Sequence, residues 1–296
     1  MSTDEREDAQ KVTATAGPAA TGEPDDADDL RGYHFGKLIH RWTTWAWIGL
    51  ATVIAAVGGF VIAGLVLAIV FAVLAFLLGL FATWKVADSR AADDFFHVYA
   101  KHRGLQLGGP TDLGSATPLL RKGDDQFAER TLTGALAPGV DGVLALFTYV
   151  TESTDSHGNR QKDYHPFTLG KTEIPECVAH VPELYCQRKF GLRALEKFED
   201  VFRHSKERVE FESEALEGKY EIFTGKEQDQ NWLRQLFEPS FIVWLTDSAP
   251  EHFAFELVDG TLVAYVHGHK EDSADLDQIA AATGAVATRL REESTE

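Results

Sequence analysis

The densest group of soft metal-ligand types is Cys177, His180 and Cys186, in a segment that we expect to form a strand over residues 178–186. Thiolate and imidazole suit zinc, but structural zinc sites usually pair ligands two to four residues apart, and a fourth ligand would have to come from a distant residue such as His165. Positions 177 and 186 would also face opposite sides of a strand. The pattern favours reduced, partly buried cysteines, and we predict no metal site.

A second constellation is the pair His267 and His269, which would share one face of a strand, with Asp272 close behind. Two such imidazoles could bind a metal or act as acid and base. Because Lys270 and Glu271 follow directly, we interpret the pair as a solvated strand end. His157 lies among turn-forming residues and is interpreted as the tip of a loop.

A third group is acidic and includes Glu207, Glu210, Glu212, Glu214 and Glu217. Glu210, Glu212 and Glu214 alternate, so in a strand they would project from one side while Phe211 points inward. Calcium binding is one interpretation, and a solvated sheet face, which needs no ligand, is the one we favour.

Motifs for nucleophilic catalysis and for phosphate binding are missing from the sequence. It contains no Gly-x-Ser-x-Gly elbow, no Gly-rich loop ending in Gly-Lys-Ser/Thr, no Gly-x-Gly-x-x-Gly and no His-Glu-x-x-His. We therefore assign no catalytic residue and no cofactor, and we favour a protein that is not an enzyme. The alternative is an enzyme whose groups converge from distant positions, built on His165, His180, His267 or His269 with nearby carboxylates.

Composition restricts the partners. The net charge is −18, from 46 acidic and 28 basic residues. This excess argues against nucleic acid, whose phosphates are bound by Lys and Arg, and against a polybasic grip on anionic lipid. Two cysteines in 296 residues exclude a disulfide scaffold.

The strongest feature of the sequence is a run of 43 residues, 42–84, without one Asp, Glu, Lys, Arg or His. One helix of that length would extend about 64 Å, twice the roughly 30 Å of a hydrocarbon core. We therefore predict a transmembrane hairpin, with spans over 42–60 and 64–84. Gly58-Gly59 and Ala63-Gly64 are the helix-weakening residues between them.

The charges around this hairpin predict its orientation. Basic residues occur before it at Arg31, Lys37 and Arg41, and after it at Lys85, Arg90, Lys101 and Arg103. By the positive-inside rule both termini are cytoplasmic. Because the spans contain no ionisable residue, they suit an anchor better than a transport pathway.

Small residues recur every four positions in both spans, at Ala51, Ala55 and Gly59, at Ala68 and Ala72, and at Ala75 and Gly79. Such faces let helix backbones approach closely, either within the hairpin or against another membrane protein, and the sequence leaves both open.

The remaining chain divides at these spans. Residues 1–30 contain nine acidic and two basic side chains and no apolar period, so we predict a disordered acidic tail. Residues 31–41 form a basic juxtamembrane segment, and residues 85–296 a cytosolic domain. In that domain we predict a helix over 92–102 that continues out of the second span, and helices over 192–202, 228–246 with a break at Pro239, and 276–290 behind a cap at Asp272 or Ser273. Strands are expected over 143–150, 164–174, 208–213, 219–224, 253–258 and 261–267, the last two joined by the hairpin signal Asp259-Gly260. Strands in runs with helices at the ends favour an α+β fold.

Two segments resemble an uncharacterised bacterial membrane-protein family, a domain of unknown function. They are Glu210-Phe211-Glu212-Ser213-Glu214-Ala215-Leu216-Glu217-Gly218-Lys219-Tyr220-Glu221-Ile222 and Leu236-Phe237-Glu238-Pro239-Ser240-Phe241 with Leu245. The resemblance covers roughly residues 208–293 and the hairpin. It implies a two-helix transmembrane hairpin before a cytosolic α+β domain, in which an extended segment leads into a helix around Leu-x-x-Pro-x-Phe, and it supplies no catalytic residue.

The sequence thus predicts an integral membrane protein of the cell membrane that anchors a cytosolic α+β domain for protein or small-ligand contacts. Its expected partners are the lipid bilayer and a membrane or cytosolic protein, and not nucleic acid. The alternative remains a membrane-bound enzyme with a histidine/carboxylate site.

Overall fold

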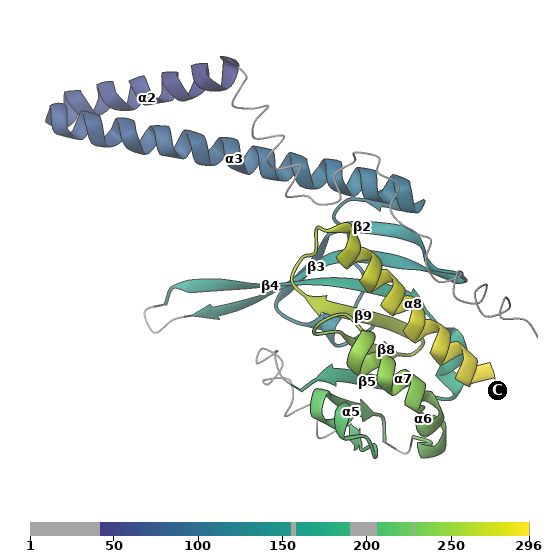
Figure 1. The fold of residues 1–296 in the computed structure, drawn as a ribbon. Helices are drawn as coiled ribbons and strands as arrows, with labels where there is room; N and C mark the ends of the chain where they lie inside the picture. The colour runs from purple at the N-terminus through teal and green to yellow at the C-terminus, as the bar shows by residue number, and fades with distance from the viewer. Residues whose placement is uncertain (1–41, 155–157, 190–205, 227, 296) are drawn as a thin grey trace, which may run out of the picture.

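The architecture is α+β, with one large antiparallel sheet flanked by helices and a pair of long helices that leave it on one side (Figure 1). A computed structural model describes residues 42–154, 158–189, 206–226 and 228–295. The predicted tail over 1–30, the juxtamembrane segment over 31–41, the loop tip at His157 and the predicted helix over 192–202 lie outside the described residues.

The apolar run forms helix α2 (Trp42–Ala63) and the first half of helix α3 (Leu65–Arg103). The break falls at Gly64, whose φ of 82° suits glycine because it has no Cβ to clash. The predicted turn region is therefore confirmed. The predicted helix over 92–102 continues directly out of the second apolar stretch, as expected, because α3 is one helix of 39 residues that ends at a left-handed Gly104.

Packing between α2 and α3 uses the row of small residues on α3. Ala68 is buried, and Ala72, Ala75 and Gly79 are half-buried in a stretch that is otherwise largely exposed. A Cβ added to Gly79 would lie 3.0 Å from Cγ1 of Ile48 on α2, so the two helices touch there without room for a larger residue. The α3 row thus packs within the hairpin, one of the two possibilities left open by the sequence.

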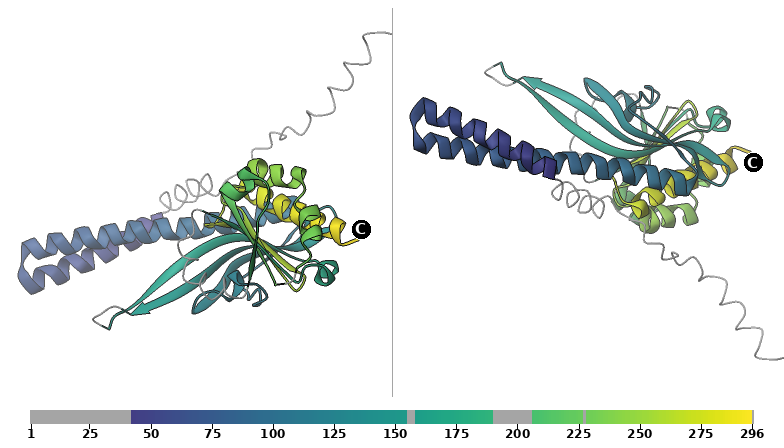
Figure 2. Two further views of the ribbon diagram at one scale, coloured as in Figure 1. Left: turned by 90° about the horizontal axis from the view of Figure 1, so that it is seen from below. Right: turned by 90° about the horizontal axis from the view of Figure 1, so that it is seen from above.

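The sheet has the strand order β1-β2-β3-β4-β9-β8-β5-β7-β6, and all neighbouring strands are antiparallel. The strands are β1 (Gln106–Gly108), β2 (Asp125–Ala137), β3 (Val140–Thr154), β4 (Arg160–Glu173), β5 (Glu183–Arg188), β6 (Glu207–Val209), β7 (Tyr220–Thr224), β8 (Ala254–Val258) and β9 (Thr261–His267). The ends of β3 and β4 extend beyond the other strands on the side of α2 (Figure 2).

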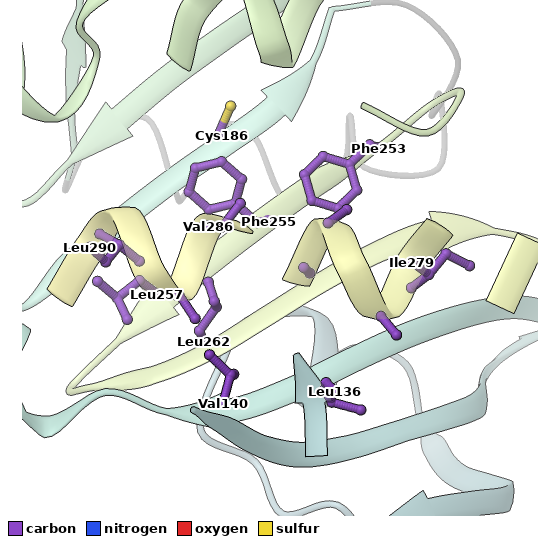
Figure 3. Packing of buried hydrophobic residues seen from close by; sticks show 14 of the residues in the cluster. Leu136, Val140, Cys186, Phe253, Phe255, Leu257, Leu262, Ile279, Val286 and Leu290 are labelled. Carbon is purple, nitrogen blue, oxygen red and sulfur yellow. The ribbon is translucent and has the colours of Figure 1, made fainter. Parts of the chain in front are cut away.

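The main core lies between one face of the sheet and the helices. These are the second half of α3, α6 (Gln230–Leu236), α7 (Pro239–Val243), its continuation η4 (Trp244–Ser248) and α8 (Ser273–Thr295). Val286 and Leu290 of α8 lie over Phe255, Leu257 and Leu262 of the sheet (Figure 3). Smaller elements complete the fold: η2 (Leu119–Arg121), η3 (Pro175–Ala179) and α5 (Glu214–Lys219).

A second cluster of buried residues covers the opposite sheet face. It includes Phe147, Tyr149, Phe167 and Tyr265, with Leu119 and Leu120 of η2 packed on them. Both faces of the central strands are therefore covered, and polar side chains on the second face must find partners inside the protein.

Several local signals are confirmed. Asp259 and Gly260 have φ of 47° and 81° and join β8 to β9, as their preference for left-handed backbone predicts. Asp272 caps α8, because its carboxylate accepts hydrogen bonds from the backbone N–H of Ala274 and Asp275. Pro239 opens α7 as expected.

Two strand predictions are wrong in part. The predicted strand over 208–213 ends at Val209, because Ser213 caps α5 and the chain must leave the sheet to begin that helix. The predicted strand over 178–186 starts as the 3-10 turn η3, which Pro175 opens, and becomes strand β5 only at Glu183.

Candidate functional site

The surface of α2 and of the first half of α3 is apolar and exposed. Large apolar side chains project outward along both helices, and Trp47 is 71% and Val61 78% exposed. One helical stretch, Ala68–Lys85, is long and apolar enough to cross a membrane, and a shorter apolar stretch covers Trp45–Gly58. An exposed apolar surface of this extent marks a contact with lipid or with another protein.

The second half of α3 is fixed to the sheet. Phe95 and Phe96 are 1% exposed and meet edge to face at 5.1 Å, within the main core. Arg130 of β2 lies over the Phe96 ring at 5.1 Å and pairs with Asp93 at 2.7 Å. On the next turns of the helix, the Tyr99 hydroxyl donates to Asp277 of α8 at 2.8 Å. One helix therefore belongs to both the apolar hairpin and the core.

A groove of about 620 Å³ opens on the helix side of the sheet, far along the chain from α3. Its lining comes from the segment after β6 and from α6 and α7: Glu210, Phe211, Glu212, Ser213, Arg234, Phe237, Pro239, Ile242 and Val243. The Phe211 and Phe237 rings meet at 4.8 Å and form an aromatic wall, while Val243 is 56% exposed. A concave site that combines aromatic and aliphatic side chains with polar groups is a candidate binding site.

Glu217 positions the Phe211 side of the groove. One oxygen of its carboxylate accepts a hydrogen bond from the backbone N–H of Phe211 at 3.1 Å, and the other pairs with Arg208 at 2.7 Å. Ser213 caps α5 by accepting from the N–H of Leu216. These bonds fix the irregular chain between β6 and α5, which carries the two exposed carboxylates of the rim.

Arg289 of α8 positions the side of the groove that α6 and α7 form. Its Nε donates to the Leu236 carbonyl at 3.2 Å, and its guanidinium lies 3.5 Å from Glu238 and 2.6 Å from Glu293. The orphan carbonyl at the end of α6 is thereby satisfied, and the joint between α6 and α7 is tied to the long C-terminal helix.

The rim of the groove is acidic on balance. Glu210 and Glu212 are exposed on either side of Phe211, and Arg234 faces them from α6. Both segments that carry the family resemblance contribute to this groove, Glu210–Ser213 from the first and Phe237 with Pro239 from the second. The predicted sheet face with Glu210, Glu212 and Glu214 is wrong, because β6 ends at Val209 and Glu214 begins helix α5, although Glu210 and Glu212 are exposed on either side of a half-buried Phe211.

A buried carboxylate lies under the opposite face of the sheet. Glu256 of β8 is fully buried and accepts hydrogen bonds from the N–H of Leu119 at 2.9 Å and from the Tyr265 hydroxyl at 3.4 Å. Burial raises the pKa of Glu256, and these bonds together with the nearby Lys122 oppose that rise. The carboxylate thus ties η2 to the sheet.

Lys122 is the cation of this cluster. It is 4% exposed, and its ammonium group lies 5.0 Å from the centre of the Tyr149 ring. Burial lowers the pKa of Lys122 to about 8, and the charge of Glu256 partly offsets this effect. Sequence reasoning missed both residues. The available signal was one glutamate in the otherwise apolar run Phe253–Val258.

Of the four histidines considered for a site, His165 and His267 lie near each other, whereas His180 and His269 lie elsewhere. His165 stacks on Tyr149 at 4.5 Å and His267 contacts Phe167 at 5.3 Å, both on the face that η2 covers. His269 lies 3.1 Å from Thr148. His180 stacks on Trp232 at 6.1 Å, in the main core. Burial and the charge of Lys122 lower the pKa of His165.

Cys177 and Cys186 are both buried and free. The Cys177 thiol donates to the Leu290 carbonyl at 3.5 Å, and burial raises the pKa of both thiols. Within the part of the chain that the structure describes, no three His, Cys, Asp or Glu side chains gather as a metal site would require.

The described residues define an α+β protein whose sheet shares one long helix with an exposed apolar helical pair. Comparisons with protein families and with curated proteins find no match. Among solved structures, the chain is similar to the crystal structure of the mycobacterial trehalose monomycolate transport factor A, TtfA. The TM-score is 0.45 at 10% identity, over 68% of this chain and 96% of that one. At this level of similarity the alignment assigns neither family nor activity.

Proposed function

We propose that this protein is a membrane-anchored recruitment domain. Helix α2 and the first half of α3 cross the cell membrane as a hairpin, both termini lie in the cytoplasm, and the sheet domain binds a protein partner in the groove beside α6 and α7. The bilayer is the first partner, and the groove receives the second.

The continuity of α3 is the observation that carries this proposal. From Leu65 to Trp84 the helix measures about 30 Å, which matches the hydrocarbon core, and the same helix continues until Tyr99 and Arg103 contact α8. Because no flexible linker separates the membrane-spanning part of α3 from the part packed on the sheet, the orientation of the hairpin fixes that of the sheet domain. The groove therefore has a fixed direction relative to the membrane. The positive flanks of the hairpin support cytoplasmic termini.

The chemistry of the groove favours a polypeptide as occupant. Its aromatic wall accepts apolar side chains, and the exposed Glu210 and Glu212 favour a basic residue beside them. We therefore propose a partner segment with apolar anchors next to a lysine or arginine.

Labelling of single cysteines tests the topology. We expect a membrane-impermeant maleimide to label Gly59→Cys, near the end of α2, in intact cells. Gly158→Cys, in the β3–β4 connection, should react only after the cells are opened. The two native cysteines are buried, so the parent chain serves as the background control. Labelling of position 158 in intact cells would refute the proposed orientation.

A charge placed in the groove tests partner binding. Val243→Glu puts a carboxylate on an exposed apolar position, where it opposes an apolar anchor and leaves the core intact. We expect cross-linking of the full chain in membranes to capture a partner that Val243→Glu loses by about tenfold, the effect of a hot-spot residue. Glu251→Gln, an exposed change outside the groove lining, is the control. Equal capture by both variants would remove the groove from the proposal.

A further inference from the structure

The β3–β4 hairpin points toward the membrane end of α3. The chain reverses at Gly104, so β1 returns alongside α3 in the opposite direction, and β3 runs parallel to β1 because both are antiparallel to β2. Strand β3 therefore advances toward the end of α3 that carries Trp84. Both views of Figure 2 show the helical pair and the β3–β4 hairpin leaving the sheet on the same side.

The last part of this hairpin is a two-stranded ribbon, formed by residues 151–154 of β3 and 160–164 of β4. Pairing with β2 ends at Val150, and pairing with β9 ends at Phe167. Beyond these points the two strands pair with each other, from Thr151 opposite Asp163 to Thr154 opposite Arg160. An isolated ribbon of two strands is marginal in water and gains stability from a surface to rest on.

Strand and helix geometry give the height of the ribbon. Arg130 is paired with Asp93 of α3 and lies opposite Leu146 of β3. Asp93 and Leu146 therefore lie at about the same position along the direction in which α3 and β3 run. Four residues along β3, about 13 Å further, Tyr164 lies opposite Val150. From Asp93 back to Trp84 the helix rises about 14 Å. Tyr164 therefore lies about as far toward the helical hairpin as Trp84, the last residue of the uncharged run in α3.

The residues beyond this level are polar. Arg160, Lys162 and Tyr164 alternate along β4, so they share one face, the face that also carries Val150 and Leu146. Leu146 belongs to the core cluster of Phe95 and Phe96, so this is the side of the sheet on which α3 lies. Tyr164 is 61% exposed, and Lys162 pairs with Glu152 at 2.9 Å.

We propose that the ribbon rests on the headgroup layer of an anionic phospholipid membrane, as a second contact beside the helical hairpin. Tyr164 lies at the interface, where tyrosine is favoured, and Arg160 and Lys162 bind lipid phosphates. Open strand edges and charges are not stable in hydrocarbon, so α3 must tilt until the ribbon lies on the headgroups. The ribbon thereby sets the tilt of the domain. This inference rests on the proposed membrane anchor.

Fluorescence quenching in vesicles tests the contact and the anchor separately. The full chain is labelled at Thr154→Cys on the ribbon, at Val73→Cys on α3, or at Glu292→Cys near the C-terminus, all exposed positions. Vesicles of phosphatidylcholine with or without phosphatidylglycerol carry nitroxide on the headgroup or on the acyl chain. With phosphatidylglycerol, we expect headgroup quenching at Thr154→Cys at least about twofold above that at Glu292→Cys. Acyl-chain quenching is expected at Val73→Cys.

The outcomes separate the two proposals. Quenching at position 73 without quenching at 154 leaves the anchor intact and overturns the ribbon contact. Absence of quenching at position 73 overturns the anchor and the ribbon contact with it. In the Thr154→Cys background, Arg160→Glu with Lys162→Glu should abolish the excess quenching, and retained quenching would show that basic residues do not make the contact.

Discussion

Replacing Phe96 by alanine is expected to lower the free energy of unfolding of the sheet domain by about 3–5 kcal/mol, the cost of truncating a buried phenylalanine. Phe96 is 1% exposed, meets Phe95 edge to face and carries Arg130 on its ring. The truncation leaves a cavity and also removes the ring under the Arg130 guanidinium. The substitution therefore weakens the packing between α3 and the sheet.

Chemical unfolding of the full chain in detergent, followed by tryptophan fluorescence, measures this loss. The matched control is His97→Ala, because His97 is the next residue on the same helix and is exposed. If Phe96→Ala unfolds at the same denaturant concentration as the parent, α3 is not part of the core, and the rigid link between hairpin and sheet is wrong.

The elements that the sequence predicts well are those with a local cause. The break near Gly64 follows from glycine in a long apolar run, and the β8–β9 turn follows from Asp259-Gly260. The cap at Asp272 and the helix start at Pro239 likewise depend on residues close in sequence. Each signal acts within one helical turn or one hairpin, so no tertiary information is needed.

Strand β2 was missed because its sequence lacks a local signature. Residues 125–137 contain Asp125, Glu129, Arg130 and three alanines, and charged residues are uncommon in strands. Arg130 is explained only by Asp93 and Phe96 of α3, which lie more than thirty residues earlier. Pairing with β3 and packing against α3 make this strand, and both are long-range.

The groove was not predicted from the sequence, although both of the segments that line it were noted. Phe211 was recognised as an inward residue between glutamates, and Leu236–Phe241 as a helical core. Their meeting depends on Glu217 and on Arg289 of α8, whose hydrogen bonds hold the two segments in place. A hydrogen bond from a side chain to a carbonyl far away in the sequence, such as that from Arg289 to Leu236, produces no periodic pattern from which it could be predicted.

The buried pair Lys122 and Glu256 gives a pH dependence that the sequence does not suggest. The unfolded chain keeps the Lys122 proton up to about pH 10.5, whereas the folded protein releases it at about 8. Between these values the unfolded state binds more protons, so stability rises with pH. From pH 8 to 9.5 we expect Lys122 to contribute a rise of about 2 kcal/mol.

The difference in stability between Lys122→Met and the parent chain isolates this effect. At pH 7 the variant avoids burying an ammonium group, and its advantage over the parent should shrink by about 2 kcal/mol as the pH approaches 9.5. Measurements stop there because the raised pKa of Tyr149, about 12, makes tyrosine ionisation oppose the trend at higher pH. Lys101→Met, which removes an exposed lysine of α3, corrects for the loss of one charge. A difference that does not change with pH would mean that Lys122 reaches water in the folded protein, and η2 would then not seal this face of the sheet.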